Sequence, residues 1–482
     1  MRLAFLLLLF SSSILFGEKP NIVILLSDDL GYGEIQHLNP DRGKIPTPHL
    51  DAIARSGMTF TDGHSTSSVC TPTRYSLLTG RYSWRTWLQK GVVKGGPSLF
   101  SSDRLTLAKF LSQNGYHTAV FGKWHLGMLF NHKKDLTQPP LGSTVTEGPL
   151  DKGGFHEFEG FHHARQMNLW IKNDTVTDHL KPIEFLPKIT KSAIDYIHRR
   201  KDQAQPFFLY LPWNSPHSPV VPTDEWQGKS SLNSHADFVM QTDHCHGQII
   251  AALRETGQLN NTLLFVTTDN GTSAPTSKID QLHKLGHYPS AHLRGSKADI
   301  WDGGHRVPFF LSWPGVIKPG STSNQLVGQI DFLATIADLL NVELPPHAAE
   351  DSISFLPHLK NEKHPNPRNS LIHHSSTGQF AIRHNHHKLI LCPGSGGWTT
   401  PRTETALESG PPYHQLYDLA TDPSEQNNLI SKHPDLAQQL QTLLQTTVTN
   451  GRTTPGPPHK NDAKITLEKW RSQIPPLSSS QR

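Results

Sequence analysis

Cysteine is scarce in this chain of 482 residues, which has only Cys70, Cys245 and Cys392. So few thiols exclude a fold held together by several disulfides, and the sequence leaves open whether Cys245 and Cys392 pair. An excess of one charge is also absent, because 45 lysines and arginines face 41 aspartates and glutamates. The formal net charge of +4 is too small for binding to nucleic acid by charge alone.

Long apolar runs are rare as well. Residues 3–10 form a short apolar stretch that follows Met1 and Arg2, and a small polar segment then leads to Gly17. This order is typical of a secretory signal peptide, and the stretch is too short for a stable membrane span. We predict a signal peptide over residues 1–17 and an exported protein, periplasmic or secreted. An uncleaved anchor is the alternative.

The most unusual feature that is present surrounds Cys70. The chain reads Cys70-Thr71-Pro72-Thr73-Arg74, directly after a run of small polar residues. Proline is tolerated in the first turn of a helix, so Pro72 predicts a helix that starts here and places Arg74 one turn beyond Cys70. A helix N-terminus beside a guanidinium favours an anion. The alternative is a buried cysteine with a packing role only.

Four apolar runs predict buried strands, over residues 21–26, 117–121, 206–211 and 263–268. Helical patterns over 47–57, 105–115, 184–200 and 237–256 lie between or beside these runs, and this alternation predicts a mostly parallel α/β sheet flanked by helices. Polar residues follow each strand. These are Asp28 and Asp29, then Lys123 and His125, then His217, then Asp269 and Asn270. Ligands bind at the carboxyl ends of parallel strands, so we expect these residues to meet at one edge.

Two adjacent carboxylates, Asp28 and Asp29, repel each other unless a cation lies between them. A simple Asp-Gly turn would account for one aspartate and not for both. Carboxylate and amide oxygens are the ligands that a hard divalent cation prefers, and Asp269 and Asn270 supply more of them. The corresponding alternative for Lys123 and His125 is an ordinary surface loop.

The chain exceeds the usual size of one domain. A linker rich in proline, histidine and asparagine runs over residues 357–368, and strands at 380–383 and 388–392 precede a helix at 435–446. We predict a catalytic domain over 18–360 and a smaller C-terminal α+β domain and tail over 361–482. The stretch 131–165 is long, polar and rich in glycine, which predicts a loop at the substrate pocket. Together with 82–103 we expect it to hold the specificity.

Several motifs resemble those of the type I sulfatases. The Cys70 motif is continued by Leu-Thr-Gly-Arg at 78–81, as in that family. Further matches are Asp-Asp-x-Gly at 28–31, Gly-Lys-Trp-His at 122–125, Pro-His-x-Pro at 216–219 and Leu-Arg-Gly-x-Lys at 293–297. Asp302 stands where the family carries glutamate in Glu-Gly-Gly-x-Arg-Val-Pro. The resemblance covers nearly all of the mature chain and is densest from residue 21 to 310.

The resemblance implies an alkaline-phosphatase-like fold and a particular site. In that family a formylglycine-generating enzyme oxidises the motif cysteine, here Cys70, during maturation. The metal is Ca²⁺, with Mg²⁺ also possible, and its implied ligands are Asp28, Asp29, Cys70 after conversion, Asp269 and Asn270. The implied catalytic residues are Cys70, Arg74, Lys123, His125, His217 and Lys297.

The function that follows from this resemblance is hydrolysis of a sulfate monoester, with a sulfated sugar or polysaccharide as the expected substrate. One hydroxyl of the hydrated aldehyde attacks sulfur, His217 or Lys297 protonates the leaving alcohol, and His125 takes the proton of the second hydroxyl. One rival keeps the fold and cleaves a phosphonate or phosphate monoester. Another is a non-catalytic protein that binds sulfated glycans.

Overall fold

The computed structural model describes residues 19–131, 139–163, 165–360 and 368–473. The predicted signal peptide, most of the predicted linker and the last residues of the tail lie outside these ranges. In the part that is described, no helix has both the length and the apolar character needed to cross a membrane.

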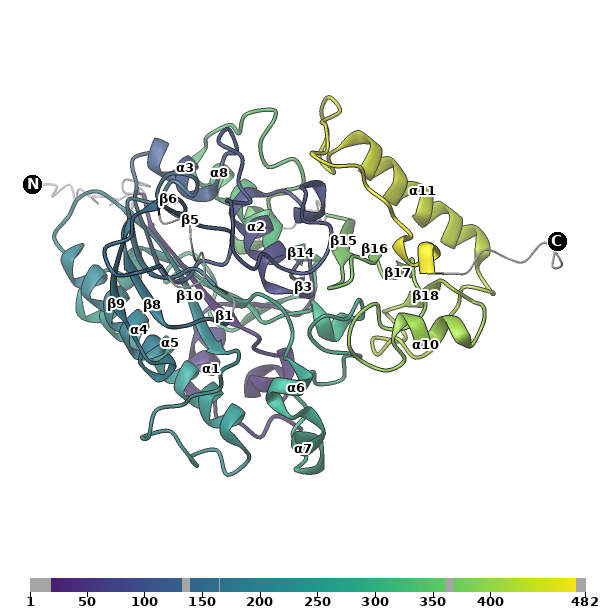
Figure 1. Cartoon of the computed structure of the whole chain (residues 1–482), viewed down its shortest axis with the longest axis horizontal. Helices are drawn as coiled ribbons and strands as arrows, with labels where there is room; N and C mark the ends of the chain where they lie inside the picture. Colours follow the sequence, from purple (N-terminus) through teal and green to yellow (C-terminus); the bar gives the residue numbers. More distant parts are fainter. Residues whose placement is uncertain (1–18, 132–138, 164, 361–367, 474–482) are drawn as a thin grey trace, which may run out of the picture.

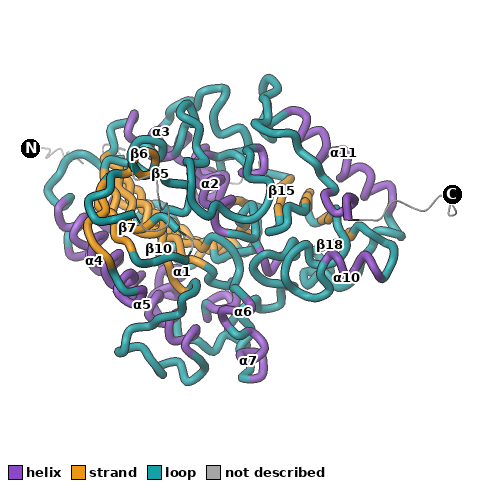
Figure 2. Tube along the Cα trace, in the orientation of Figure 1, coloured by secondary structure: helices purple, strands orange, loops and turns teal. Residues whose placement is uncertain are grey.

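A ten-stranded sheet forms the centre of the larger part of the molecule (Figures 1 and 2). Its strands in order are β13 (Ser321–Ser323), β2 (Met58–Phe60), β12 (Phe309–Ser312), β11 (Thr262–Thr268), β1 (Asn21–Asp28), β10 (Phe207–Pro216), β4 (His117–Lys123), β7 (Glu157–Phe161), β8 (Leu169–Lys172) and β9 (Thr175–His179). The five strands from β11 to β7 run parallel, while β12 and β8 join them antiparallel. The predicted mostly parallel sheet is therefore confirmed.

Two apolar cores cover the two faces of this sheet, because alternate side chains of a strand point to opposite faces. In β1, Ile22, Ile24 and Leu26 belong to one core and Val23 and Leu25 to the other. The first core includes side chains of α2 (Cys70–Thr79), α3 (Leu107–Gln113), α8 (Phe332–Leu340) and α9 (Leu356–Leu359), and the second those of α1 (Pro48–Ser56), α4 (Pro182–Arg199) and α5 (Ser234–Glu255). Figure 1 shows these groups on opposite sides of the strands.

The stretch predicted as a loop over 131–165 differs from that expectation where it is described. Its end forms β7, which adds a parallel strand to β4, and residues Val145–Glu147 form β6, which pairs with β5 (Leu129–Phe130). In β7 the polar Glu157 and Glu159 alternate with the buried Phe158 and Gly160. This alternation is the period of a strand, but five residues among many glycines gave a weak pattern.

A smaller antiparallel sheet builds the C-terminal part, at the right of Figure 1. Its strands are β15 (Ser370–His374), β16 (Phe380–His384), β17 (His387–Ile390) and β18 (Gln415–Asp418). Leu440 and Leu444 of α11 (Pro434–Asn450) share an apolar cluster with Ile382 and Leu389. The predicted small C-terminal α+β unit is confirmed, while its boundary at residue 361 stays a prediction.

The other elements are short. Besides several 3-10 turns, they are β3 (Gly63–His64), paired with β14 (Val327–Gly328), and the helices α6 (Ala274–Ser277), α7 (Ile279–Lys284) and α10 (Thr403–Glu408). All three cysteines are buried and free, so Cys245 and Cys392 do not pair.

Gly122 of β4 lies so close to β10 that a larger residue would not fit there. It has φ +131°, and a Cβ atom there would lie 2.0 Å from the carbonyl oxygen of Pro212 in β10. We expect Gly122→Ala to cost about 3 kcal/mol or more of unfolding free energy, because a backbone clash adds to conformational strain. Gly115 has φ +87° and open space around it, so Gly115→Ala should cost only about 1–2 kcal/mol. Equal shifts of the two thermal unfolding curves would contradict this reading.

Candidate active site

The predicted site residues do meet at the carboxyl ends of the parallel strands. Asp28 is the last residue of β1, and Lys123 is the last residue of β4. Asp29, His217 and Asp269 come directly after β1, β10 and β11. Since these strands are hydrogen-bonded neighbours in the order β11-β1-β10-β4, sheet formation alone brings the four segments together.

Cys70 is the first residue of α2 and is buried, with 2% of its surface exposed. Its Sγ atom lies 3.6 Å from Nζ of Lys297. Burial raises the pKa of the Cys70 thiol to about 12, although Lys123 and Lys297 act in the opposite direction. The unmodified side chain is therefore a neutral thiol at neutral pH, and a thiol is a far poorer nucleophile than a thiolate.

Each of the three carboxylates of the site pairs most closely with a different basic side chain, and Arg74 also lies 3.7 Å from Asp28 Oδ2. Lys123 Nζ lies 2.5 Å from Asp28 Oδ2, and Lys297 Nζ lies 2.5 Å from Asp29 Oδ1. Arg74 donates to Asp269 Oδ2 at 2.8 and 3.0 Å. Arg74 is thus one turn beyond Cys70, as predicted, but its guanidinium is directed to the carboxylate of Asp269, directly after β11.

These pairs decide the charges of the carboxyl groups. Burial would raise the pKa of Asp28 and of Asp29, but the neighbouring Lys123 and Lys297 lower them below the ordinary value. Asp269 differs, because burial and the nearby Asp28 raise its pKa in spite of Arg74. The site as a whole holds more carboxylate oxygen than its basic side chains cover.

Three buried oxygen atoms of the site accept no hydrogen bond from any residue that the structure describes. They are Oδ1 of Asp28, Oδ2 of Asp29 and Oδ1 of Asn270. The amide nitrogen of Asn270 donates to Asp29 Oδ1 at 2.8 Å and to the Gly271 carbonyl at 2.9 Å, which leaves its oxygen free. Buried acceptors without a donor are costly, and a divalent cation would satisfy all three.

One ligand atom each of Asp28, Asp29, Cys70 and His217 also lies within 4.8 Å of the others. The residues fit a hard cation here.

The two histidines of the site have defined tautomers, because a backbone carbonyl can only accept a hydrogen bond. His125 Nε2 lies 2.9 Å from the Val93 carbonyl, so its unpartnered Nδ1 carries the lone pair. His217 Nδ1 lies 2.6 Å from the Ser218 carbonyl, and its Nε2 lies 3.8 Å from Asp29 Oδ2. Burial lowers the pKa of both imidazoles.

One positioning residue escaped the sequence analysis. Thr71 donates its hydroxyl hydrogen to the carbonyl of His125 at 2.9 Å and accepts from the backbone N–H of Val93 at 3.2 Å. It therefore ties the first turn of α2 to His125 and to the 82–103 stretch. Its only sequence signal is its place next to Cys70, which does not distinguish it from a solvent-facing threonine.

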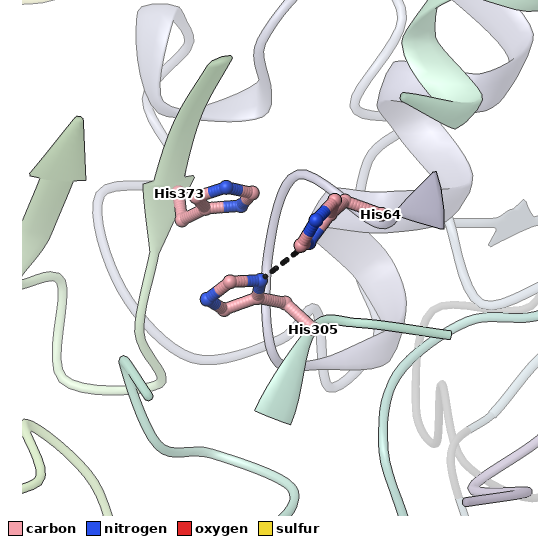
Figure 3. Close-up of side chains that lie close together, drawn as sticks. All are labelled: His64, His305 and His373. Carbon is pink, nitrogen blue, oxygen red and sulfur yellow. Dashed lines mark hydrogen bonds between the residues drawn. The ribbon is translucent and has the colours of Figure 1, made fainter. Parts of the chain in front are cut away.

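A cluster of buried histidines lies where β3, of the two-stranded β3–β14 sheet, meets β15 of the C-terminal sheet. It consists of His64, His305 and His373 (Figure 3). The rings of His305 and His373 stack with centroids 3.7 Å apart and planes at 12°. A metal ion lies in the plane of an imidazole that binds it, so two stacked rings cannot share one ion. Despite its composition, this arrangement does not suit a metal.

Two members of this cluster, His305 and His64, belong to a row of close polar contacts between β17 of the C-terminal sheet and β3. Lys388 Nζ of β17 lies 3.1 Å from His305 Nε2, and the Nδ1 atoms of His305 and His64 are 3.1 Å apart. His64 Nε2 lies 2.9 Å from Asp62 Oδ1. His305 Nε2 also lies 3.1 Å from the Ile300 carbonyl, and a carbonyl can only accept, so this nitrogen cannot both donate to Ile300 and accept from Lys388. Lys388 also pairs with Asp302 at 2.7 Å and with Glu425 at 2.8 Å.

Comparison with known proteins adds family evidence to this geometry. The family model described as "Sulfatase" matches residues 20–342, and the one described as "N-sulphoglucosamine sulphohydrolase, C-terminal" matches residues 296–394. The second match crosses the predicted domain boundary at residue 361. It begins in the segment of Lys297 and ends beyond β17.

Individual relatives match over most of the chain. N-acetylgalactosamine-6-O-sulfatase of Bacteroides thetaiotaomicron is 30% identical, over 90% of this chain and 94% of that protein. Arylsulfatase A of Bos taurus is 30% identical, over 89% of this chain and 87% of that protein. A solved structure from work on the metabolism of multiple glycosaminoglycans by Bacteroides thetaiotaomicron has a TM-score of 0.79 at 29% identity and covers 89% of this chain and 99% of that chain.

The substitution Lys388→Met tests the buried contacts that Lys388 makes with His305, Asp302 and Glu425. Burial would raise the pKa of Asp302, and Lys388 holds it well below its usual value. Without the ammonium two buried carboxylates lose their cation, so we expect a loss of about 3–5 kcal/mol of unfolding free energy at pH 8.

The loss should be smaller at pH 5. The substitution raises the folded-state pKa of both carboxyls, so the folded variant binds more protons than the unfolded chain and gains stability as the pH falls. Lys191→Met, which breaks an exposed pair with Asp195, should change the unfolding free energy by less than about 0.5 kcal/mol. Equal losses for Lys388→Met at pH 5 and pH 8 would argue against this assignment.

Proposed function

This chain belongs to the sulfatase family and is a sulfatase, and we propose that it is exported and cleaves a sulfate monoester of a carbohydrate by means of a formylglycine made from Cys70 and a bound divalent cation. The observation that carries this proposal is the set of three unpartnered oxygens of Asp28, Asp29 and Asn270 beside the buried Cys70. Such a set suits a cation, and such a thiol is unsuited to act without modification.

Asp28, Asp29, Asp269 and Asn270 would hold the cation, for which Ca²⁺ suits the all-oxygen donor set and Mg²⁺ is the alternative. When bound, it would polarise the sulfate ester and lower the pKa of the hydroxyl at residue 70. The hydrated formylglycine at position 70, made by a formylglycine-generating enzyme during maturation, would supply the hydroxyl that attacks sulfur.

The remaining roles fall to side chains of this chain. Lys297 Nζ already faces the side chain of residue 70 at 3.6 Å, and Lys123 lies next to Asp28, so both ammonium groups can stabilise negative charge on a sulfate bound between them. Arg74 adds positive charge behind Asp269. His125 presents a lone pair on Nδ1 and is the proposed acceptor of the proton from the second hydroxyl of the hydrate.

Two rival functions keep the same architecture. A phosphonate or phosphate monoester hydrolase would use the same cation and basic groups, and a comparison of sulfate and phosphate esters at equal concentration separates it from a sulfatase. A non-catalytic binder of sulfated glycans would keep Cys70 unmodified. The carbohydrate part of the proposal draws on the N-acetylgalactosamine-6-O-sulfatase of Bacteroides thetaiotaomicron, which is 30% identical to this chain.

The proposed nucleophile is tested by mass analysis of the peptide that holds Cys70, in protein purified from its own host. We expect sulfur replaced by oxygen with loss of two hydrogens. Cys70→Ser retains one hydroxyl and should either trap a sulfated enzyme or be inactive, because a single hydroxyl offers no route to expel sulfate. Cys245→Ala, which alters another buried cysteine, should keep multiple turnovers. Wild-type turnover by Cys70→Ser, or an unmodified thiol in host protein, would refute the scheme.

The proton donor to the leaving alcohol is either His217 or Lys297, and leaving groups of different basicity distinguish them. A nitrophenolate leaves without a proton, whereas a sugar alkoxide needs one. If His217 is the donor, His217→Ala should lower kcat for a sugar sulfate by about 10²–10⁴-fold and should lower kcat for 4-nitrophenyl sulfate much less. Equal losses on both substrates would remove His217 from this role and favour Lys297.

A further inference from the structure

A cavity of about 900 Å³ lies beside the proposed sulfate site, where the large part of the molecule meets the C-terminal part. Its walls come from α6 and α7, from the segment between Tyr288 and Ser296, and from residues 398–402 of the C-terminal part. This volume is within the range of sites that bind small ligands. None of the residues already given a role in catalysis lines it.

Trp398 is the unusual member of the lining. It is 37% exposed, one of four large apolar side chains in the described chain that remain open to solvent, and of those four it is the one that lines this cavity. Folding leaves part of this indole uncovered at the wall of a concave site. Such a ring can stack against a ligand that has a flat apolar face and polar edges. A sugar ring offers such a surface.

The loop that carries Trp398 is fixed to the segment that carries Lys297. The buried carboxylate of Asp299 accepts hydrogen bonds from the backbone N–H groups of Trp398 at 2.8 Å, Thr399 at 3.0 Å and Ser296 at 2.9 Å. Arg402 Nε donates to the Trp398 carbonyl at 3.0 Å. One carboxylate thus holds both walls of the cavity in place, and a preorganised wall lowers the cost of binding.

The cavity adjoins the reacting centre through two short links. Ser296 lines it, and the next residue, Lys297, places its Nζ 3.6 Å from Cys70 Sγ. On the other side Ser273 lines it, and the preceding residue, Thr272, accepts a hydrogen bond from the Lys297 backbone N–H at 2.8 Å. A ligand with one group at Cys70 therefore has its neighbouring unit within reach of this cavity.

The charges of the lining favour an anion. Arg165 and Arg402 contribute two guanidinium groups, against the single carboxylate of Asp280. A guanidinium matches the geometry of a carboxylate or a sulfate, with two parallel hydrogen bonds.

We propose that this cavity binds the sugar unit next to the one that loses its sulfate, and that this neighbouring unit is anionic. The proposal rests on the proposed function, since it places the substrate around the same Cys70. The ring of the neighbouring unit stacks on Trp398, and its carboxylate or sulfate pairs with Arg402 and Arg165. Specificity for the polymer then resides in the C-terminal part and not only in the 82–103 and 131–165 stretches.

Binding to full-length Cys70→Ala protein tests the cavity without turnover. The probes are tetrasaccharides titrated in a calorimeter: unsulfated chondroitin, with carboxylates only; ι-carrageenan, with sulfates only; chondroitin 6-sulfate, with both; and neutral maltotetraose. We expect at least one anionic probe to bind about tenfold or more tightly than maltotetraose. The better ligand of the first two tells whether the cavity selects carboxylate or sulfate.

Single substitutions in the same background locate the contact. Trp398→Ala and Arg402→Gln should each weaken the anionic probe about tenfold. Trp398→Phe, which keeps a ring, should lose much less, and Leu285→Ala, at an exposed apolar residue outside the lining, should bind as the parent does. Thermal unfolding of each variant checks that it is folded.

Three results would overturn the proposal: no anionic probe binds, maltotetraose binds equally well, or Trp398→Ala binds as the parent does. A loss on Trp87→Ala without a loss on Trp398→Ala would likewise overturn it and assign recognition to the 82–103 stretch. Failure of Cys70-intact protein to hydrolyse 4-nitrophenyl sulfate counts against the proposed function alone, because the binding measurements need no turnover.

Discussion

The structure depends on one electrostatic constraint, the burial of three carboxylates at one edge of a parallel sheet. Asp28, Asp29 and Asp269 are all inaccessible to solvent or nearly so. Burial of an ionised carboxyl is costly unless a cation and hydrogen bonds compensate. Lys123, Lys297 and Arg74 each cover one oxygen of a different carboxylate. The oxygens that remain uncovered suit a further cation, and the proposed chemistry rests on that cation.

The C-terminal part supports the position of the active site without supplying any of its named catalytic or metal-binding residues. The segment before Cys70 is held from both sides, since Ser68 donates its N–H to the His374 carbonyl at 3.2 Å while its own carbonyl accepts from Ala298 at 2.8 Å. The contacts of His305 with Lys388 and with His64 also link β17 to β3 in this region. Docking of the two parts therefore sets the position of residue 70. The match of a C-terminal family model from residue 296 onward agrees with this continuity.

The groups proposed for catalysis and those proposed for substrate specificity lie in different parts of the molecule. Strand ends supply the charged groups, and these positions are fixed by hydrogen bonding between neighbouring strands. The exposed side chains of Trp398 and Arg402, which are proposed to contact the substrate, lie on a loop of the C-terminal part. The buried carboxylate of Asp299 anchors this loop to the site. Such a loop can change its outward side chains without disturbing the strand ends, because its anchors are backbone N–H groups.

Local pattern in the sequence determined the four parallel strands, the helices between them and the set of residues that their ends bring together. It did so because the apolar pattern of a strand and the polarity of the residues after it are both read from a short stretch of sequence. It did not find β7, whose five residues gave a weak pattern, nor Thr71, whose role depends on a distant carbonyl. Only the tertiary structure decided that Arg74 pairs with Asp269, that Lys388 reaches His305, and that the backbone of Trp398 is bound by Asp299. These contacts join residues far apart in the chain, and their energies depend on burial that no sequence window contains.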